Sequence, residues 1–373
     1  MELRQLGRTG LRVAPLALGT MTWARDTDAD DAATQLRDFV DAGGTLLDTA
    51  ASYADGDCEE LIGSLLGSVV DRSDVTICTK VGVRRLADGS GVIDASRGNL
   101  LASLDASLRR LGTDHVDVFC VQSPDPLTPI EETIDALRLA VTSGRARYVA
   151  LSNFPAWRTA QAATLLAGDV GLAAVEVEHS LVQRGVEREL LPAARELGLG
   201  VLAWSPLGRG VLTGKYRRTV PADSRAASSH LAGFVSPYLT AEHSAVVEAL
   251  CTAAEGLGRR PLEVALAWLL GRPGVSAAVL GARVERVVRE QFGDSYSPGV
   301  AAWIDTDPDP VAIVYAYATG SPDRIAAIAE TIHAELTAMA AGDITEAEFV
   351  AAKAPVVESY QFVDNGEFMQ HVL

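Results

Sequence analysis

Polar side chains occur at or just past the ends of short apolar runs at several points in this chain of 373 residues. They comprise two carboxylates, one ammonium, two amides and two hydroxyls, namely Asp48, Lys80, Gln122, Ser152, Asn153, Glu176 and Ser205. Groups of these types bind polar ligands and transfer protons. Each one taken alone is more often a turn or helix cap. Their recurrence after successive runs favours a shared site, provided that the fold brings the ends of the runs together.

Eight β-rich apolar runs alternate with amphipathic segments as far as about residue 283. The runs are residues 15–20, 45–50, 75–81, 116–122, 148–153, 173–179, 200–205 and 277–282. Between them, stretches such as 94–112 and 131–146 place apolar residues three and four apart, which indicates helices. Eight such units of the α/β class most simply close into a (β/α)8 TIM barrel. The carboxyl ends of barrel strands meet at one face, where the polar side chains would gather.

The composition indicates a folded protein rather than a disordered or membrane-embedded one. Hydrophobic residues make up 48% of the chain and charged residues 22%. The formal net charge of -17 opposes attraction to nucleic acid or to anionic membranes. The N-terminus lacks a basic region followed by a long apolar core, and no window approaches a membrane span. We expect a cytoplasmic protein with neither nucleic acid nor membrane as a partner.

The four cysteines are too widely spaced for a zinc or redox motif. Cys58, Cys78, Cys120 and Cys251 form neither a CxxC pair nor a Cys/His cluster. We therefore expect reduced thiols and no metal site.

Residues 206–240 form a connection that is longer than barrel loops usually are. The segment is punctuated by Gly, Ser and Pro. We expect a cofactor or substrate loop, and the alternative is a disordered loop without function.

Ordered motifs in residues 1–283 resemble the aldo-keto reductase superfamily, especially its bacterial members related to potassium-channel β-subunits. The motifs are LLDTAASYADGDCEELIG, TKVG, ALSNF, LAWSPLGRGVLTGKY and AVLGAR. The resemblance implies an NADP-dependent aldo-keto oxidoreductase that reduces small aldehydes or ketones to alcohols.

Three of the four catalytic residues implied by the resemblance are present. Carbonyl reduction needs an acid that protonates the oxygen, and Tyr53 stands at the position of that acid. The ammonium of Lys80 is expected to lower the pKa of the phenol, and Asp48 is expected to hold Lys80. Gln122 replaces the family's histidine. An amide can donate a hydrogen bond but cannot supply a proton, so we expect weakened activity.

The resemblance also implies contacts to a nicotinamide. Ser152 and Asn153 match the residues that bind its carboxamide, and Trp204 matches the aromatic residue that stacks on its ring. Glu176 stands where the family has glutamine. When ionised it accepts hydrogen bonds but donates none, which predicts poorer binding of the carboxamide.

The rest of the implied ligand site lies in the loops. Phosphate contacts are expected from Ser205, Leu207, Gly208 and Gly210, with backbone N–H groups of the glycines facing the pyrophosphate. Arg283 is the candidate for the 2′-phosphate, which favours NADPH over NADH, and Gln291 falls near an adenine contact. Trp23 is expected to line the mouth for a small carbonyl substrate.

Residues 285–373 resemble a different family, the pitrilysin-type (M16) zinc peptidases, in the C-terminal part of the peptidase domain. The segments REQFGDSYSP, VAIVYAYAT and ITEAEF carry this resemblance, and the zinc motif HxxEH is absent. The sequence thus predicts a barrel domain, 1–283, and an α+β tail, 284–373, in place of the usual last helix. The tail's unpaired strand edge makes docking on the barrel or self-association an expectation.

Three hypotheses follow from these patterns. The first is an NADPH-dependent carbonyl reductase. The second is a barrel that binds or senses NADP(H) with little turnover, which Gln122 and Glu176 favour. The third is a non-functional fusion whose barrel seam is left uncovered by the lost last helix.

Overall fold

The computed structural model describes residues 1–85, 91–221, 224–228 and 230–281, together with the backbone of 299–305 and 311–317. The chain divides into two units, Met1–Val287 and Val288–Leu373. The positions of Arg283 and Gln291, and the helices expected in the tail, lie outside the described residues.

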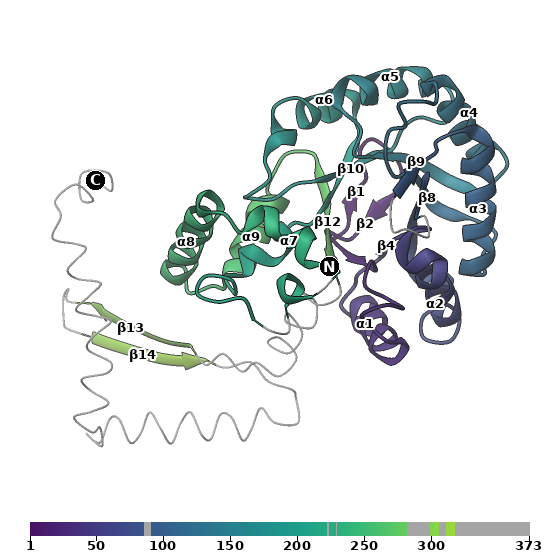
Figure 1. The fold of residues 1–373 in the computed structure, drawn as a ribbon. Helices are drawn as coiled ribbons and strands as arrows, with labels where there is room; N and C mark the ends of the chain where they lie inside the picture. The colour runs from purple at the N-terminus through teal and green to yellow at the C-terminus, as the bar shows by residue number, and fades with distance from the viewer. Residues whose placement is uncertain (86–90, 222–223, 229, 282–298, 306–310, 318–373) are drawn as a thin grey trace. The chain divides into compact units, whose positions relative to one another are not determined.

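Eight parallel strands of the first unit close into a barrel (Figure 1). In ring order they are β10 (Ala174–Glu178), β11 (Gly200–Trp204), β12 (Val275–Gly281), β3 (Leu16–Gly19), β4 (Leu46–Ala50), β5 (Thr76–Val81), β8 (Val116–Val121) and β9 (Ala146–Ser152). Each of the eight predicted runs overlaps one of these strands, which confirms the predicted barrel. Every residue of β4 is buried, as expected where helices cover a parallel sheet.

Helices connect successive strands and lie on the outside of the ring (Figure 1). They are α1 (Ala29–Asp41), α2 (Asp57–Leu65), α3 (Arg97–Leu111), α4 (Ile130–Thr142), α5 (Ala156–Leu166), α6 (Leu190–Leu197), α8 (Ala241–Gly256) and α9 (Pro261–Leu270). Helices α3 and α4 confirm the two helices expected from periodicity. The start of α1 is fixed by Asp28, whose carboxylate accepts a hydrogen bond from the Asp31 N–H at 2.9 Å.

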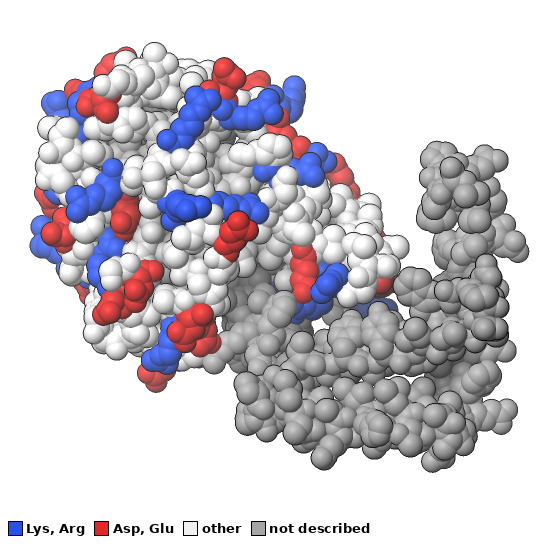
Figure 2. Space-filling model, turned by 180° about the vertical axis from the view of Figure 1, so that it is seen from behind, with Lys and Arg blue, Asp and Glu red and all other residues white. Residues whose placement is uncertain are grey.

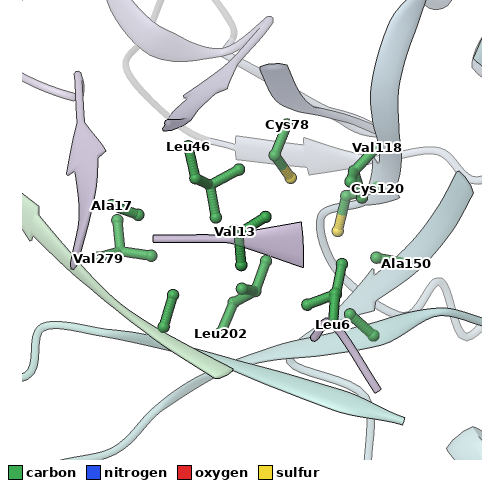
Figure 3. Packing of buried hydrophobic residues seen from close by; sticks show 12 residues of the cluster. Leu6, Val13, Ala17, Leu46, Cys78, Val118, Cys120, Ala150, Leu202 and Val279 are labelled. Atoms are coloured by element: carbon green, nitrogen blue, oxygen red, sulfur yellow. The ribbon is translucent and has the colours of Figure 1, made fainter. Parts of the chain in front are cut away.

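A hairpin that was not predicted from the sequence closes the amino-terminal end of the barrel. Strands β1 (Arg4–Gln5) and β2 (Arg12–Val13) pair antiparallel. The Arg8 N–H donates to the carbonyl oxygen of Gly198, just before β11, at 2.8 Å. Leu6 and Val13 are fully buried, and Val13 lies among side chains from the surrounding strands (Figure 3). This end of the barrel interior is therefore apolar.

The long loop after β11 is made of short helical turns rather than irregular chain. They are η4 (Gly208–Thr213), η5 (Arg225–Ala227), α7 (Ala232–Val235) and η6 (Ser236–Tyr238). Other short elements are η1 (Tyr53–Gly56), η2 (Arg72–Asp74), η3 (Gly185–Glu187) and the hairpin of β6 (Val83–Arg85) with β7 (Gly91–Ile93).

The described part of the second unit is an antiparallel pair of strands, β13 (Gly299–Asp305) and β14 (Val311–Tyr317). Strand β14 confirms the clearest strand expected in the tail.

Basic and acidic side chains are interspersed over the face of the molecule shown in Figure 2. Within the described part of the chain, every helix is too short or too polar to cross a lipid bilayer.

We predict that Leu6→Ala destabilises the barrel. The Leu6 side chain is 0% exposed, so its truncation leaves a cavity and lowers the free energy of unfolding by about 2–5 kcal/mol. Urea denaturation measures the change. Leu3→Ala is the control, because Leu3 is 37% exposed and should cost under about 1 kcal/mol. Equal losses in the two variants would contradict this role for the hairpin.

Candidate active site

A buried ion cluster lies inside the barrel at the carboxyl ends of the strands. Lys80 on β5 places its Nζ 2.5 Å from Asp48 Oδ1 on β4 and 3.1 Å from Glu176 Oε1 on β10. Strands β4 and β10 stand opposite each other in the ring, so the lysine joins two sides of the barrel. Each of the three side chains is only 3% exposed. The predicted partners Asp48 and Lys80 are thus in contact, and Glu176 is a second partner.

The protonation of this cluster is set by burial and by its internal charges. Burial alone would lower the pKa of Lys80, but Asp48 and Glu176 together raise it well above its ordinary value. Burial and the neighbouring Asp48 together raise the pKa of Glu176 to about 8, against the opposing effect of Lys80. Lys80 is therefore charged at neutral pH.

Tyr53 lies beside this ammonium at the start of η1, directly after β4. Its ring centroid is 5.5 Å from Lys80 Nζ. The turn that presents it holds Ala54 and Asp55 at φ 47° and 54°, a left-handed conformation that is uncommon for non-glycine residues. The backbone is strained where the phenol is displayed.

The expected lowering of the Tyr53 pKa is wrong for this structure. Burial raises the pKa of the half-buried phenol by more than Lys80 lowers it, and Asp48 and Glu176 add to the rise. Tyr53 consequently keeps its proton at neutral pH.

The ends of β8, β9 and β11, next to the cluster's strands β5 and β10, hold an amide network. Trp204 donates from Nε1 to Asn153 Oδ1 at 3.1 Å, and Asn153 Nδ2 donates to the Gln122 carbonyl oxygen at 3.0 Å and to Ser152 Oγ at 3.1 Å. The Gln122 side chain accepts from Ser52 Oγ at 3.0 Å through its own Oε1. The side-chain amide nitrogen of Gln122 is therefore available to donate a hydrogen bond to a ligand.

A cavity of about 240 Å³ lies at the carboxyl face of the barrel. The expected site residues that reach it are Asp48, Tyr53, Lys80, Gln122, Ser152, Asn153, Glu176, Trp204, Ser205, Leu207 and Gly210. The convergence expected from the strand ends is therefore present in the fold.

Two expected site residues do not line this cavity. Trp23 is 0% exposed, and its Nε1 donates to Gln35 Oε1 on α1 at 3.0 Å, so it packs against a helix. Its expected place at the substrate mouth is wrong. Gly208 is also absent from the lining, and a side-chain Cβ there would lie 2.5 Å from Val182 Cγ2. This glycine is required by close packing and its positive φ of 55°.

The expected use of glycine N–H groups for phosphate is also not available in this loop conformation. The Gly208 N–H donates to the Ser205 carbonyl oxygen at 2.9 Å, and the Gly210 N–H donates to the Leu207 carbonyl oxygen at 3.0 Å. Both donors are satisfied by the turns of η4.

The long loop supplies two cavity residues that were not predicted from the sequence. Arg209 and Arg225 both line the cavity. Arg209 donates two hydrogen bonds to Glu178, at 2.8 and 2.7 Å, and its guanidinium lies 4.2 Å from the Phe234 ring centroid. The arginine within the GRG run was the signal available, and it binds the loop to the end of β10.

The four cysteines are buried free thiols, as expected.

The comparisons agree with this geometry. The profile of the Aldo/keto reductase family matches residues 15–295. A protein named "Uncharacterized oxidoreductase YrpG" from Bacillus subtilis (strain 168) is 35% identical over 301 residues, which span 78% of this chain and 90% of that protein. The chain belongs to the aldo/keto reductase family and is an oxidoreductase homologue with a TIM barrel.

Two other relatives differ in what their names describe. A "Probable voltage-gated potassium channel subunit beta" from Oryza sativa subsp. japonica is 35% identical over 304 residues, covering 78% of this chain and 90% of its own length. An "L-glyceraldehyde 3-phosphate reductase" from Escherichia coli (strain K12) is 35% identical over 295 residues, covering 76% and 84%.

We predict that Lys80→Met destabilises the fold at neutral pH. The change leaves buried carboxyl groups without their cation, which costs about 3–5 kcal/mol of unfolding free energy. Chemical denaturation measures it against Lys215→Met, the exposed control, for which we expect under about 0.5 kcal/mol. A Lys80→Met protein as stable as this control would contradict the paired cluster.

Proposed function

We propose that this protein is an NADPH-dependent reductase that converts small aldehydes or ketones to alcohols. The observation that carries the proposal is the position of Tyr53. Its ring centroid lies 5.5 Å from the buried ammonium of Lys80, and the residue lines the cavity at the carboxyl face. Membership of the aldo/keto reductase family supports the same reaction class.

The cavity residues fit a nicotinamide cofactor. Trp204 offers an indole whose orientation is fixed by its hydrogen bond to Asn153, and a flat ring can stack on it. Ser152 adds a hydroxyl to the same wall. When bound there, a dihydronicotinamide supplies the hydride that attacks the carbonyl carbon.

Residues of the chain supply the proton and stabilise the charge that its transfer leaves behind. Tyr53 donates its phenolic proton to the carbonyl oxygen as negative charge develops, and the Lys80 ammonium then stabilises the phenolate. The amide nitrogen of Gln122 donates a hydrogen bond to the same oxygen and orients it. Because Gln122 cannot supply a proton, Tyr53 is the sole acid in this proposal, and activity is weaker than with a histidine.

We assign the preference for NADPH to residues that follow the last barrel strand, β12. Arg283 remains the proposed ligand of the 2′-phosphate, since a guanidinium matches phosphate geometry. It follows the described Gly281 by two residues, and Arg225 lies against Gly281 within the cavity wall. Gln291 is proposed for the adenine end.

A second candidate function is an NADP(H)-binding or sensing barrel with little turnover. The specific observation that favours it concerns Gln122, which stands in the place of the family's histidine. Its side-chain oxygen already accepts a hydrogen bond from Ser52 Oγ, so this atom is engaged within the protein. Binding without turnover would select this function.

The chain as a whole is proposed to consist of a barrel and a tail. We place the boundary between the barrel, 1–283, and the peptidase-like tail, 284–373, at the end of AVLGAR, and we assign the tail no peptidase activity. We propose a cytoplasmic protein that acts on small carbonyl compounds and self-associates through its tail.

We predict that Tyr53→Phe abolishes reduction while leaving cofactor binding intact. The phenylalanine keeps the ring but removes the proton, so turnover should fall by at least about 100-fold. Loss of NADPH absorbance with a panel of aldehydes, including glyceraldehyde 3-phosphate, measures the rate. Equal rates for both proteins would refute the assigned acid.

We predict that NADPH quenches the fluorescence of Trp204 and binds more tightly than NADH by about tenfold, or about 1.4 kcal/mol. Quenching should be lost in Trp204→Leu and kept in Trp157→Phe, because Trp157 is 67% exposed and lies outside the cavity lining. Quenching that survives in Trp204→Leu would contradict the stacking role, and equal affinities would contradict the preference for NADPH.

A further inference from the structure

The ion cluster contains more carboxyl groups than its single cation can neutralise. Asp48 and Glu176 both contact the Nζ of Lys80, and all three side chains are almost fully buried. If both carboxyl groups were ionised, the cluster would carry one uncompensated negative charge away from water, which is costly. Neutralising one carboxyl group removes this cost.

The contacts indicate which carboxyl group takes the proton. Asp48 makes the shorter contact, 2.5 Å, whereas Glu176 Oε1 lies 3.1 Å from the ammonium. Glu176 Oε2 is buried and has no hydrogen-bond partner among the residues that the structure describes. No hydrogen-bond donor stabilises a negative charge on this buried oxygen. Burial therefore favours the neutral, protonated form of Glu176.

We propose that Glu176 is a positioning residue that carries a proton in the resting site, and that losing this proton makes Tyr53 a weaker acid. With Glu176 neutral, the charge of Lys80 is balanced by Asp48 alone. The effect of Glu176 on catalysis rests on the proposed reductase function, but the protonation state of Glu176 does not.

The groups facing Glu176 support this assignment. They are Asp48 on β4, Lys80 and Cys78 on β5, Tyr53 on η1 and Cys120 on β8. The Cys78 sulfur and the Asp48 and Glu176 carboxyl oxygens lie within 4.8 Å of one another. Burial raises the pKa of both thiols well above its ordinary value, so neither thiol supplies charge at neutral pH. Lys80 is the only cation among these neighbours.

Ionised Glu176 acts on Tyr53 through charge. A negative Glu176 raises the pKa of the phenol, because it opposes formation of a second anion nearby. It also competes with the phenolate for the Lys80 ammonium. Reduction should therefore slow once Glu176 loses its proton, whose pKa is about 8.

The ligand-free protein provides the first test, by infrared spectroscopy. A protonated buried carboxyl group gives a C=O stretch that disappears on ionisation. We expect this band at pH 6, its loss with a midpoint near pH 8, and its absence from Glu176→Gln. The matched control is Glu59→Gln, which removes a fully buried carboxyl group that binds Arg110 away from the cavity and should leave the band unchanged. A wild-type protein without the band, or a band that persists in Glu176→Gln, would overturn the proposal.

Unfolding gives a second readout that needs no substrate. The folded-state pKa of Glu176, about 8, is raised above its ordinary value of 4.5. Its contribution to stability is therefore complete below about pH 4.5 and is lost as the pH rises through about 8. Between these values the unfolding constant of the wild type should rise by up to about tenfold per pH unit relative to Glu176→Gln. Parallel pH profiles would count against a protonated Glu176.

The pH dependence of turnover links the residue to the reaction. We expect the wild-type rate of carbonyl reduction to fall by at least about threefold from pH 7 to pH 9, and the Glu176→Gln rate to stay flat. The Glu59→Gln rate should fall as in the wild type. A titrating carboxyl group in a protein that reduces no aldehyde would refute the reductase function alone. Turnover with the same pH profile in wild type and Glu176→Gln would refute the role of Glu176 in tuning Tyr53.

Discussion

The site depends on one interaction, the burial of the Lys80 ammonium between carboxyl groups from opposite sides of the barrel. An ammonium loses its hydration at this depth, and only close anionic partners offset that cost. Asp48 and Glu176 can reach the same atom because the strands close into a ring that sets β4 opposite β10. Closure of the barrel is thus a condition for holding a buried positive charge beside Tyr53.

The two ends of the barrel interior differ in polarity and in backbone strain. The hairpin of β1 and β2 fills the amino-terminal end with apolar side chains, including Leu6 and Val13 (Figure 3). The carboxyl end holds the polar groups and the strained turns. Asn153, Ser205 and Arg209 all have positive φ and all line the cavity. Non-glycine residues persist in that conformation only where the surrounding structure enforces it, which the packed barrel below them does.

Much of the architecture could be predicted from the sequence because buried parallel strands are continuous apolar runs. The hairpin of β1 and β2 could not, since strands of two residues show no periodicity. The polar residues at strand ends were also predictable as a group, because all strands of a barrel end at one face. Their individual partners were not predictable. Glu176 was expected to face a carboxamide, whereas the structure pairs it with Lys80, and this contact depends on ring geometry that no local pattern encodes.

Burial also decided two features that were predicted wrongly, the place of Trp23 and the pKa of Tyr53. Trp23 follows β3 and is aromatic, which suits a substrate mouth, but its ring is enclosed and its N–H binds Gln35. For Tyr53 the sequence suggested a charge effect on the pKa, whereas desolvation is the larger effect in the folded protein. Neither outcome could be weighed without knowing how much water reaches each side chain.

The chain contains only three lysines, Lys80, Lys215 and Lys353. Nuclear magnetic resonance of protein labelled with ¹⁵N-lysine can therefore observe the Lys80 ammonium directly. We expect one ammonium signal at neutral pH that exchanges with water far more slowly than that of exposed Lys215 and that vanishes in Lys80→Met. A Lys80 signal that exchanges as fast as Lys215, or that shows a neutral amine at pH 7, would contradict a charged lysine held between two buried carboxyl groups.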